Sequence, residues 1–318
     1  MVALFACDLG VVQSNFRPMF KTVMIWLTAA AVAFPSPSAA ATPEPLVLKP
    51  SSTWQVNYAE DQCRLARQFG EGEQAVLLFM DRYGPSEYFR MSISGKLMRT
   101  SIEKGDADVQ FGPVEAEQQL SFLNGFLGKQ PALVFASAAR IAGRTAAETA
   151  AYTNRDQSEA VLVQPISEER QSATKYLRIG KPLRTPVVLQ TGSMRAPLAA
   201  LNTCIDDLLT TWGVDVEKHK NLTQPVKPLK SPGEWIVASD YPLQMLVAGQ
   251  PALVSFRLSV GADGVPTACH IQATTRPKEF DDAVCKSVMR RARFSPAIDA
   301  EGMPLASYYQ NSVYFRIP

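Results

Sequence analysis

The chain has 318 residues, which is long enough for two domains of ordinary size. Hydrophobic residues make up 46% of it and charged residues 19%, a balance typical of globular proteins and not of disordered chains. The formal net charge is +2, from 32 basic and 30 acidic residues. This small excess gives no argument for a nucleic-acid partner or for an anionic membrane surface.

The N-terminus has the features of an export signal. Lys21 precedes a run of about twelve apolar residues, Val23–Phe34, and small residues follow at 35–42. The run is short for a membrane span, which needs about 20 apolar residues. We therefore predict a signal peptide over residues 1–42 that is cleaved near Ala39–Thr42. An uncleaved, tilted membrane anchor is the alternative.

A mostly β N-terminal domain is predicted over residues 43–214. Residues 43–50 are Pro-rich and extended, and the packed part is expected to begin at Trp54. Short aromatic and apolar runs alternate with Gly-containing turns, a pattern typical of a sandwich or an open barrel. The expected strands are Ala75–Met80, Glu87–Ser94, Lys96–Ser101, Ala107–Phe111, Pro131–Ala138, Tyr176–Ile179 and Thr185–Leu189. The Ala-rich segment Gly143–Tyr152 is a helix candidate.

A helix is predicted to close this domain. Its first turn contains Pro197 and it is expected to end at Gly213. Apolar residues recur on one face, namely Leu198, Leu201, Ile205, Leu208 and Trp212. Cys204 lies close to this face and is therefore expected to point into the core, where it could meet Cys63. Disulfides persist in exported proteins, and two separate buried thiols are the alternative.

Residues 215–233 carry four Lys and three Pro, a composition typical of a linker, and the second domain is placed at 234–318. Alternating apolar residues over Ala252–Val260 predict a strand with one buried face. Asp263-Gly264 predicts a hairpin turn, because glycine accepts the positive φ that the turn needs.

The rest of this domain gives the order β-β-α-β. The return strand is expected to place four residues on one face, namely Val265, Cys269, Ile271 and Ala273. Phe280–Ala292 is predicted to be a helix, with Cys285 beside its apolar face, and Tyr309–Ile317 a last strand. An antiparallel sheet with a helix on it makes the chain α+β. A Cys269–Cys285 disulfide would close a loop of about 17 residues and stabilise the fold by roughly 3 kcal/mol.

Several short segments of this second domain occur in a characteristic order and spacing. They are Tyr241-Pro242, Ala252–Val260, Asp263-Gly264-Val265, Phe280-Asp281, Arg293-Phe294-Ser295-Pro296-Ala297, Gly302-Met303-Pro304 and Val313-Tyr314-Phe315. With this set the domain resembles the C-terminal domain of TonB, the periplasmic part of a bacterial energy transducer. One departure is Thr274-Thr275-Arg276-Pro277, which stands where many members have Ser-Ser-Gly.

The resemblance implies a partner and a mode of binding. In that family the domain docks on outer-membrane TonB-dependent receptors, and a receptor segment adds as a strand to its sheet edge. The expected edge is Tyr308–Ile317, and the implied partner-binding residues are Tyr241, Pro242, Gln310, Ser312, Tyr314 and Arg316. Purely structural roles are the alternative for all six. Another envelope protein, or a second copy of the chain, could occupy the same edge.

The leading hypothesis is thus a periplasmic protein that binds its partner by strand pairing in TonB-dependent transport. A full energy transducer needs a long Pro-rich spacer to cross the periplasm, and the linker of about 20 residues would span only about 60 Å as polyproline II. An inner-membrane energy transducer with an uncleaved anchor is the alternative hypothesis. An enzyme housed in the first domain is a third. His219 and His270 have no nucleophile nearby in sequence, and no catalytic motif is present. We therefore predict no catalytic residue and no cofactor. We also predict no metal site, since the Cys spacing does not suit zinc.

Overall fold

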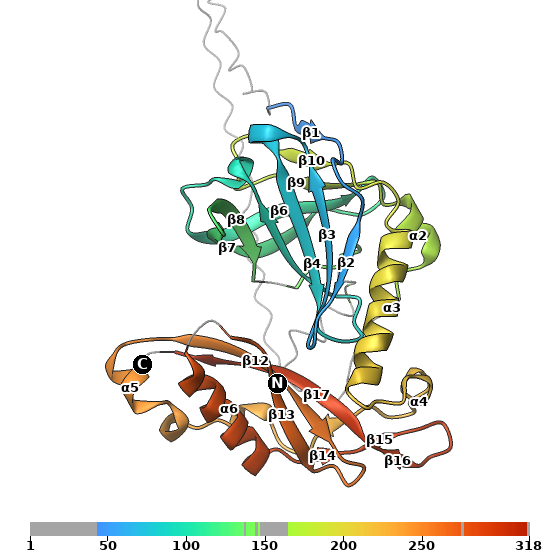
Figure 1. The fold of residues 1–318 in the computed structure, drawn as a ribbon, viewed down its shortest axis with the longest axis vertical. Coiled ribbons are helices and arrows are strands. Elements are labelled where there is room, and N and C mark those ends of the chain that lie inside the picture. Colours follow the sequence, from blue (N-terminus) through green and yellow to red (C-terminus); the bar gives the residue numbers. More distant parts are fainter. Residues whose placement is uncertain (1–42, 137, 144–145, 147–164, 275–276, 317–318) are drawn as a thin grey trace, which may run out of the picture. The chain divides into compact units, whose positions relative to one another are not determined.

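The computed structural model describes residues 43–136, 138–143, 146, 165–274 and 277–316, and Figure 1 shows their fold. The architecture is mixed α+β, with a large curled sheet, few helices and a small C-terminal β region. The predicted signal peptide and most of the predicted helix Gly143–Tyr152 lie outside the described residues. Among the described residues, no helix combines the length and apolarity needed to cross a membrane.

The first part of the chain forms a ten-stranded sheet in the order β1-β10-β9-β6-β7-β8-β5-β4-β3-β2. All pairs are antiparallel except β1 with β10, which run parallel. The strands are β1 (Leu46–Leu48), β2 (Gln55–Tyr58), β3 (Cys63–Phe69), β4 (Val76–Arg82), β5 (Arg90–Ser94), β6 (Lys104–Gly112), β7 (Gln118–Leu127), β8 (Gln130–Phe135), β9 (Tyr176–Ile179) and β10 (Val187–Leu189). Short 3-10 helices η1 (Gly72–Gln74) and η2 (Lys96–Met98) and the helix α2 (Glu168–Ala173) connect them.

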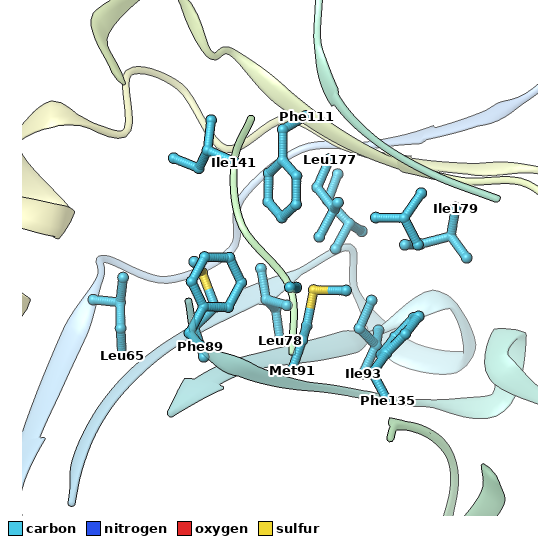
Figure 2. Close-up of a cluster of buried hydrophobic side chains, with 14 of the residues drawn as sticks. Leu65, Leu78, Phe89, Met91, Ile93, Phe111, Phe135, Ile141, Leu177 and Ile179 are labelled. Atoms are coloured by element: carbon cyan, nitrogen blue, oxygen red, sulfur yellow. The ribbon is translucent and has the colours of Figure 1, made fainter. Parts of the chain in front are cut away.

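The curled sheet encloses a core that its own side chains fill. Figure 2 shows part of this core, where Phe89, Met91 and Phe111 lie among aliphatic residues. Alternate residues of β4, such as Leu78 and Met80, are fully buried, so this strand presents one face to the core.

One predicted strand of this sheet needs correction, and several observed strands were not predicted. The segment Lys96–Ser101 is not a strand but begins with η2, because the Gly95 N–H bonds to the Pro131 carbonyl and the chain then turns so that Met98 enters the core. The strands β2, β3 and β7 were missed, since their exposed positions carry long polar or apolar side chains that blur the alternation. The Pro-rich start also contributes β1, which pairs with β10.

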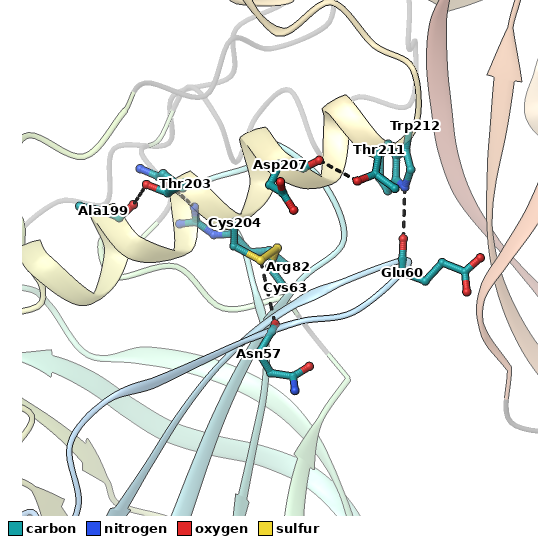
Figure 3. The surroundings of a disulfide bond; sticks show 11 residues. Asn57, Glu60, Cys63, Arg82, Ala199, Thr203, Cys204, Asp207, Thr211 and Trp212 are labelled. Atoms are coloured by element: carbon teal, nitrogen blue, oxygen red, sulfur yellow. Dashed lines mark hydrogen bonds between the residues drawn. A yellow bond between two sulfur atoms is a disulfide. The ribbon is translucent and has the colours of Figure 1, made fainter.

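The predicted closing helix is present as α3 (Arg195–Thr211), and Gly213 follows it with a φ of 77°. Figure 3 shows Cys204 of this helix joined to Cys63 of β3, which confirms the predicted pairing. Below the helix, the Arg82 guanidinium donates to the Asn202 side chain, with an N–O distance of 2.7 Å. The disulfide and this hydrogen bond hold α3 against the edge of the curled sheet.

The C-terminal part forms a three-stranded antiparallel sheet in the order β13-β12-β17. Its strands are β12 (Ala252–Val260), β13 (Pro266–Thr274) and β17 (Ser307–Phe315), and α6 (Lys278–Arg291) packs on one face (Figure 1). Shorter elements complete it, namely α5 (Leu243–Val247), η3 (Pro232–Glu234), η4 (Ala238–Asp240), β14 (Phe294–Ser295), β15 (Ala297–Ile298) and β16 (Pro304–Leu305). The predicted β-β-α-β order is confirmed.

The α6 face of this sheet is apolar. Val254, Phe256 and Leu258 of β12 pack with Val284 and Val288 of α6, and all five are fully buried or nearly so. The predicted Cys269–Cys285 disulfide joins β13 to α6 and is also present. A register shift between Ser255 and Phe256 pairs Ala273 with Ser255, so Ala273 does not continue the α6-facing row that was predicted for it.

The segment predicted as a linker contains two elements that contact their neighbours. The helix α4 (Val216–Lys220) is capped by Asp215, whose carboxylate accepts the Lys218 N–H at 3.1 Å. The short strand β11 (Lys227–Pro228) pairs with β14. The segment predicted as a linker is therefore partly ordered by hydrogen bonds, within α4 and between β11 and β14.

Candidate partner-binding site

The strand β17 lies at the edge of the three-stranded sheet, as predicted. It pairs with β12 along its whole length, and no other described strand pairs with it on its outer side. The Ser312 N–H donates to the Oδ1 of Asn311, with an N–O distance of 2.8 Å, and we infer that it points to the outer side of the strand. Backbone groups alternate in direction along a strand, so those of Gln310 and Tyr314 also point outward.

The side chains across this part of the sheet agree with that direction. Ser312 lies opposite Ser255, and their Oγ atoms are 2.8 Å apart. Directly opposed side chains come this close in pairs whose backbones do not bond to each other. Within the described part of the chain, the outer edge of β17 therefore presents backbone groups that no neighbouring strand pairs with.

A cavity of about 300 Å³ adjoins this edge on the α6 side. Its wall includes Trp235, Ile236 and Val288, together with Asn311 and Val313 of β17. Trp235 is 2% exposed, and its ring makes edge contacts with Phe294 and Tyr309 at centroid distances of 5.4 Å. The indole N–H of Trp235 is buried, and none of the described residues accepts a hydrogen bond from it.

The predicted site residues Gln310, Ser312, Tyr314 and Arg316 divide into two groups. Gln310 is half-buried, and its Nε2 donates to the Tyr83 carbonyl and, at 2.9 Å, to the Gln272 Oε1. The other three are exposed, and the Arg316 guanidinium lies 5.0 Å from the centre of the Tyr314 ring. The exposed part of the predicted set thus lies in the C-terminal half of β17 and just after its end.

The remaining predicted pair, Tyr241 and Pro242, lies at the end of β17. The Tyr241 hydroxyl donates to the Gln250 carbonyl at 2.6 Å, and its ring contacts Phe315 and Phe280 edge-on. These contacts give Tyr241 a structural role in the sheet's core. The pair also lines a cavity of about 520 Å³ beside α6.

Asp240 fixes the chain just before this pair. Its carboxylate accepts two hydrogen bonds from Arg291 of α6, at 2.5 and 3.1 Å, and one from the Val237 N–H at 2.8 Å. The bonds from Arg291, followed by the Val237 N–H, lower the pKa of Asp240 to about 2. The charged carboxylate therefore ties the segment around Trp235 and Tyr241 to α6.

The face of the sheet opposite α6 is buried as well, although the alternation predicted a single buried face. Ser255 and Arg257 are 5% and 4% exposed. Arg90 of β5 donates to the Ser255 Oγ at 2.8 Å, and the Arg257 guanidinium lies 4.1 Å from the Trp212 ring centre. Polar residues of β12 are thus covered by side chains from the ten-stranded sheet and α3.

The same cover reaches β17. Trp212 contacts Tyr308 edge-on at 5.4 Å between ring centres, and burial raises the pKa of Tyr308 to about 12. Burial also lowers the pKa of Arg257, whose nearest carboxylate, that of Asp61, lies 3.7 Å away. These contacts leave the outer edge of β17 and its C-terminal half as the accessible part of the strand.

Sequence reasoning did not foresee the contact of His219. Its Nε2 lies 2.8 Å from the Ser307 Oγ, and its Nδ1 lies 3.0 Å from the Asp215 carbonyl. Ser307 is 7% exposed, so its hydroxyl is not presented to solvent as a nucleophile would be. The described residues contain no group of three or more His, Cys, Asp or Glu side chains placed to hold a metal ion.

Trp235 and Asn311 were also missed as site residues. Trp235 lies six positions before Tyr241, outside any periodic pattern, and only the rarity of tryptophan could have drawn attention to it. Asn311 falls between two predicted outward residues, Gln310 and Ser312, and no role was predicted for it. Its role at the edge depends on its side chain turning back to the strand's own backbone.

Comparison with known proteins agrees with the C-terminal architecture. Residues 237–317 match the family model described as Gram-negative bacterial TonB protein C-terminal. The match covers roughly a quarter of the chain and confirms the resemblance that the short segments indicated. A search of curated proteins found no match to the chain.

Proposed function

We propose that the protein is a periplasmic TonB-like protein that binds an envelope partner by strand addition at β17, since residues 237–317 match the model of the TonB C-terminal family. The partner is the periplasmic segment of an outer-membrane TonB-dependent receptor. The observation that carries this proposal is the outer edge of β17, which no other described strand covers and where the Ser312 N–H donates to the side chain of its own neighbour, Asn311. An added strand would supply carbonyl and N–H partners along this edge.

The exposed residues of β17 support the same function. Tyr314 is 56% exposed, and with Arg316 it offers an aromatic and a cationic contact beside the edge. Aromatic and arginine side chains are those most often found at the centre of protein interfaces. Gln310 contributes through its outward backbone groups, since its side chain is already bonded to Tyr83 and Gln272.

Capture of a receptor tests this proposal. The full chain, Tyr314→Pro and Tyr314→Phe are each used to bind proteins from outer-membrane extracts, and bound proteins are identified by mass spectrometry. Proline removes one outward N–H without removing a bond to β12, so we expect receptor capture to be lost. Phenylalanine keeps that N–H and the ring, so capture should persist. Equal capture by all three forms would contradict strand addition at this edge.

Fractionation tests the cellular location. We expect a periplasmic, soluble protein whose N-terminus lies near residue 40, in keeping with the predicted signal peptide. A protein that sediments with the inner membrane and retains residues 1–42 would favour the energy-transducer alternative instead. A second copy at the β17 edge would appear as a dimer that Tyr314→Pro dissociates.

A further inference from the structure

We propose that the tip of the β7–β8 hairpin docks on a phospholipid surface that carries anionic headgroups. The apolar side chains of the tip enter the boundary between headgroups and acyl chains, and the cations around it meet the phosphates. The tip belongs to the ten-stranded sheet, and its docking does not depend on strand addition at β17. Three observations support it, namely the protrusion of the tip, its exposed apolar side chains and a local excess of cations.

The hairpin tip stands clear of the rest of the sheet. β7 and β8 pair as far as Leu127 and Gln130, so that only Gly128 and Lys129 form the turn (Figure 1). Gly128 has a φ of 60°, which suits glycine in such a tight turn. The residues Phe126–Gln130 are all exposed, and a Cβ placed on Gly128 would meet no atom of the described chain within 4 Å beyond its chain neighbours. The tip can therefore approach a surface without rearrangement around it.

Exposed apolar side chains gather at this tip. Phe126 is 73% exposed, and Leu127 beside it is 37% exposed. Leu123 lies on the same face as Leu127 and pairs with Val134 of β8, and these two residues are 51% and 38% exposed. Single exposed apolar residues are ordinary on protein surfaces, whereas a group of neighbours of this kind marks an interaction site.

The segment between η2 and β6 adds to the tip. The Asn124 side chain donates to the Thr100 carbonyl at 3.0 Å, and the Asn124 N–H donates to the Glu103 carbonyl at 2.8 Å. These bonds hold Ile102, which is 46% exposed, next to β7. The exposed side chain of Arg99 comes from the same segment. A further apolar side chain and a cation thus lie beside the hairpin.

The charged residues of the two segments that form the tip, 96–104 and 121–134, are mostly cations. Three exposed cations form no ion pair with a described residue, and they are Arg99, Lys104 and Lys129. Lys96 is paired with Glu73, so within these segments Glu103 is the carboxylate left to offset them. Three cations and one carboxylate leave a charge of +2, which equals the net charge of the entire chain. The nearly neutral balance of the chain therefore conceals a local cationic surface.

A lipid surface fits this combination better than a folded protein partner does. A stable protein interface takes about 20–30 residues from each side, whereas the tip offers a few apolar side chains on a protruding turn. The boundary of a bilayer closes around such side chains, and its anionic headgroups attract the cations beside them. Aromatic residues with Lys and Arg nearby are typical of protein segments that lie in this boundary.

Flotation with lipid vesicles tests the proposal. The purified full chain and its variants are mixed with vesicles of phosphatidylcholine and phosphatidylglycerol, or of phosphatidylcholine alone, and the bound fraction is measured at increasing lipid concentration. Phe126→Ser removes the most exposed side chain of the tip, so we expect about tenfold weaker binding. Val114→Ser is the matched control, because Val114 is 61% exposed in the turn between β6 and β7 and away from the tip. Its binding should equal that of the wild type.

Lys129→Gln separates the charge of the tip from its apolar contact. A cation close to an anionic bilayer strengthens binding roughly fivefold. We therefore expect this loss on vesicles that contain phosphatidylglycerol and no change on phosphatidylcholine alone. Added salt should weaken the first kind of binding, because it screens the attraction. An equal effect on both kinds of vesicle, or none on either, would overturn the recognition of anionic headgroups.

A reporter at the tip excludes the contribution of the predicted signal peptide, whose apolar run could bind lipid by itself. Phe126→Trp places an indole there, and its emission is obtained as the difference from the wild-type spectrum. We expect this emission to shift to shorter wavelength when anionic vesicles are added. Thermal unfolding first establishes that each variant is folded.

Two outcomes contradict the proposal. If the emission of Phe126→Trp does not shift, the tip does not enter the bilayer, whichever segment brings the chain to the vesicle. If the wild type binds no vesicle but retains a protein from envelope extracts that Phe126→Ser fails to retain, the tip is a protein contact and lipid docking is wrong. Neither outcome affects strand addition at β17, because Phe126 and β17 belong to different sheets.

Discussion

The two faces of the three-stranded sheet are buried by different chemistry. On the α6 side, Phe256 and its apolar neighbours meet a helix that a disulfide fixes to β13. On the other side, Ser255 and Arg257 are equally buried but meet polar groups, Arg90 and Asp61, and the ring of Trp212. The α6 face supplies the stability of this region. On the polar face, by contrast, each buried polar side chain needs its own hydrogen-bond or ion-pair partner to offset the cost of its burial. A sheet held on both faces leaves its edge as the place where a partner can add.

The largest difference between the faces should appear on truncating Phe256. Phe256→Ala removes a ring that is 1% exposed from the apolar core, and we expect a loss of roughly 3–5 kcal/mol in the free energy of unfolding. Ser255→Ala, its neighbour on the polar face, should cost about 1.5 kcal/mol through the lost bond from Arg90. Urea denaturation measures both, and equal costs would remove the contrast between the faces.

The disulfide of the α6 face is expected to contribute the next largest effect. Replacing Cys269 and Cys285 together by Ser opens a loop between residues 16 positions apart, which costs about 3 kcal/mol by the loop-entropy model. The midpoint of urea denaturation reports this loss under oxidising conditions. With a reductant present, wild type and the double variant should converge, because both then lack this crosslink.

The sequence predicts those features of the two faces that arise from residues close together in the chain, and not those that arise from contacts between distant residues. The alternation over Ala252–Val260 predicted β12 to the residue, and the helix and both disulfides followed from apolar periodicity and the placement of four cysteines. The burial of the polar face could not be predicted. Ser255 and Arg257 have the composition of a solvent-facing row, and only contacts with residues about 45 to 200 positions earlier in the chain bury them.

The candidate site shows the same limit. The edge strand and its exposed residue Tyr314 could be predicted, because strand order and outward positions follow from the pattern of β17. The cavity could not, since Trp235 reaches the strand through a 3-10 turn that has no sequence period. The contact of the Asn311 side chain could not be predicted either, because an amide at that position can form hydrogen bonds on either face of the sheet or with the backbone of its own strand.

Arg257 offers a sharper test of the polar face. Arg257→Met keeps much of the side-chain volume but removes the cation over Trp212 and leaves Asp61 without its nearest cation, so we expect a loss of about 1–2 kcal/mol in unfolding free energy. Arg316→Met is the matched control, because Arg316 lies over Tyr314 in an exposed setting. There the same change should cost no more than about 0.5–1 kcal/mol. Similar costs at the two sites would mean that burial adds nothing to the Arg257 contact.

The smallest effect concerns Asp240, at the rim of the α6 face. Its pKa of about 2 in the folded chain lies below the ordinary value of 3.8, chiefly because Arg291 donates to it. A lowered carboxylate pKa adds stability above the ordinary value, and this is lost as the pH falls through the folded value. The stability difference between wild type and Asp240→Asn should therefore be constant from pH 7 to about 5 and shrink between about pH 4 and pH 2. Urea denaturation at fixed ionic strength measures it, and a difference that stays constant down to pH 2 would show that the Arg291 contact acts through shape and not through charge.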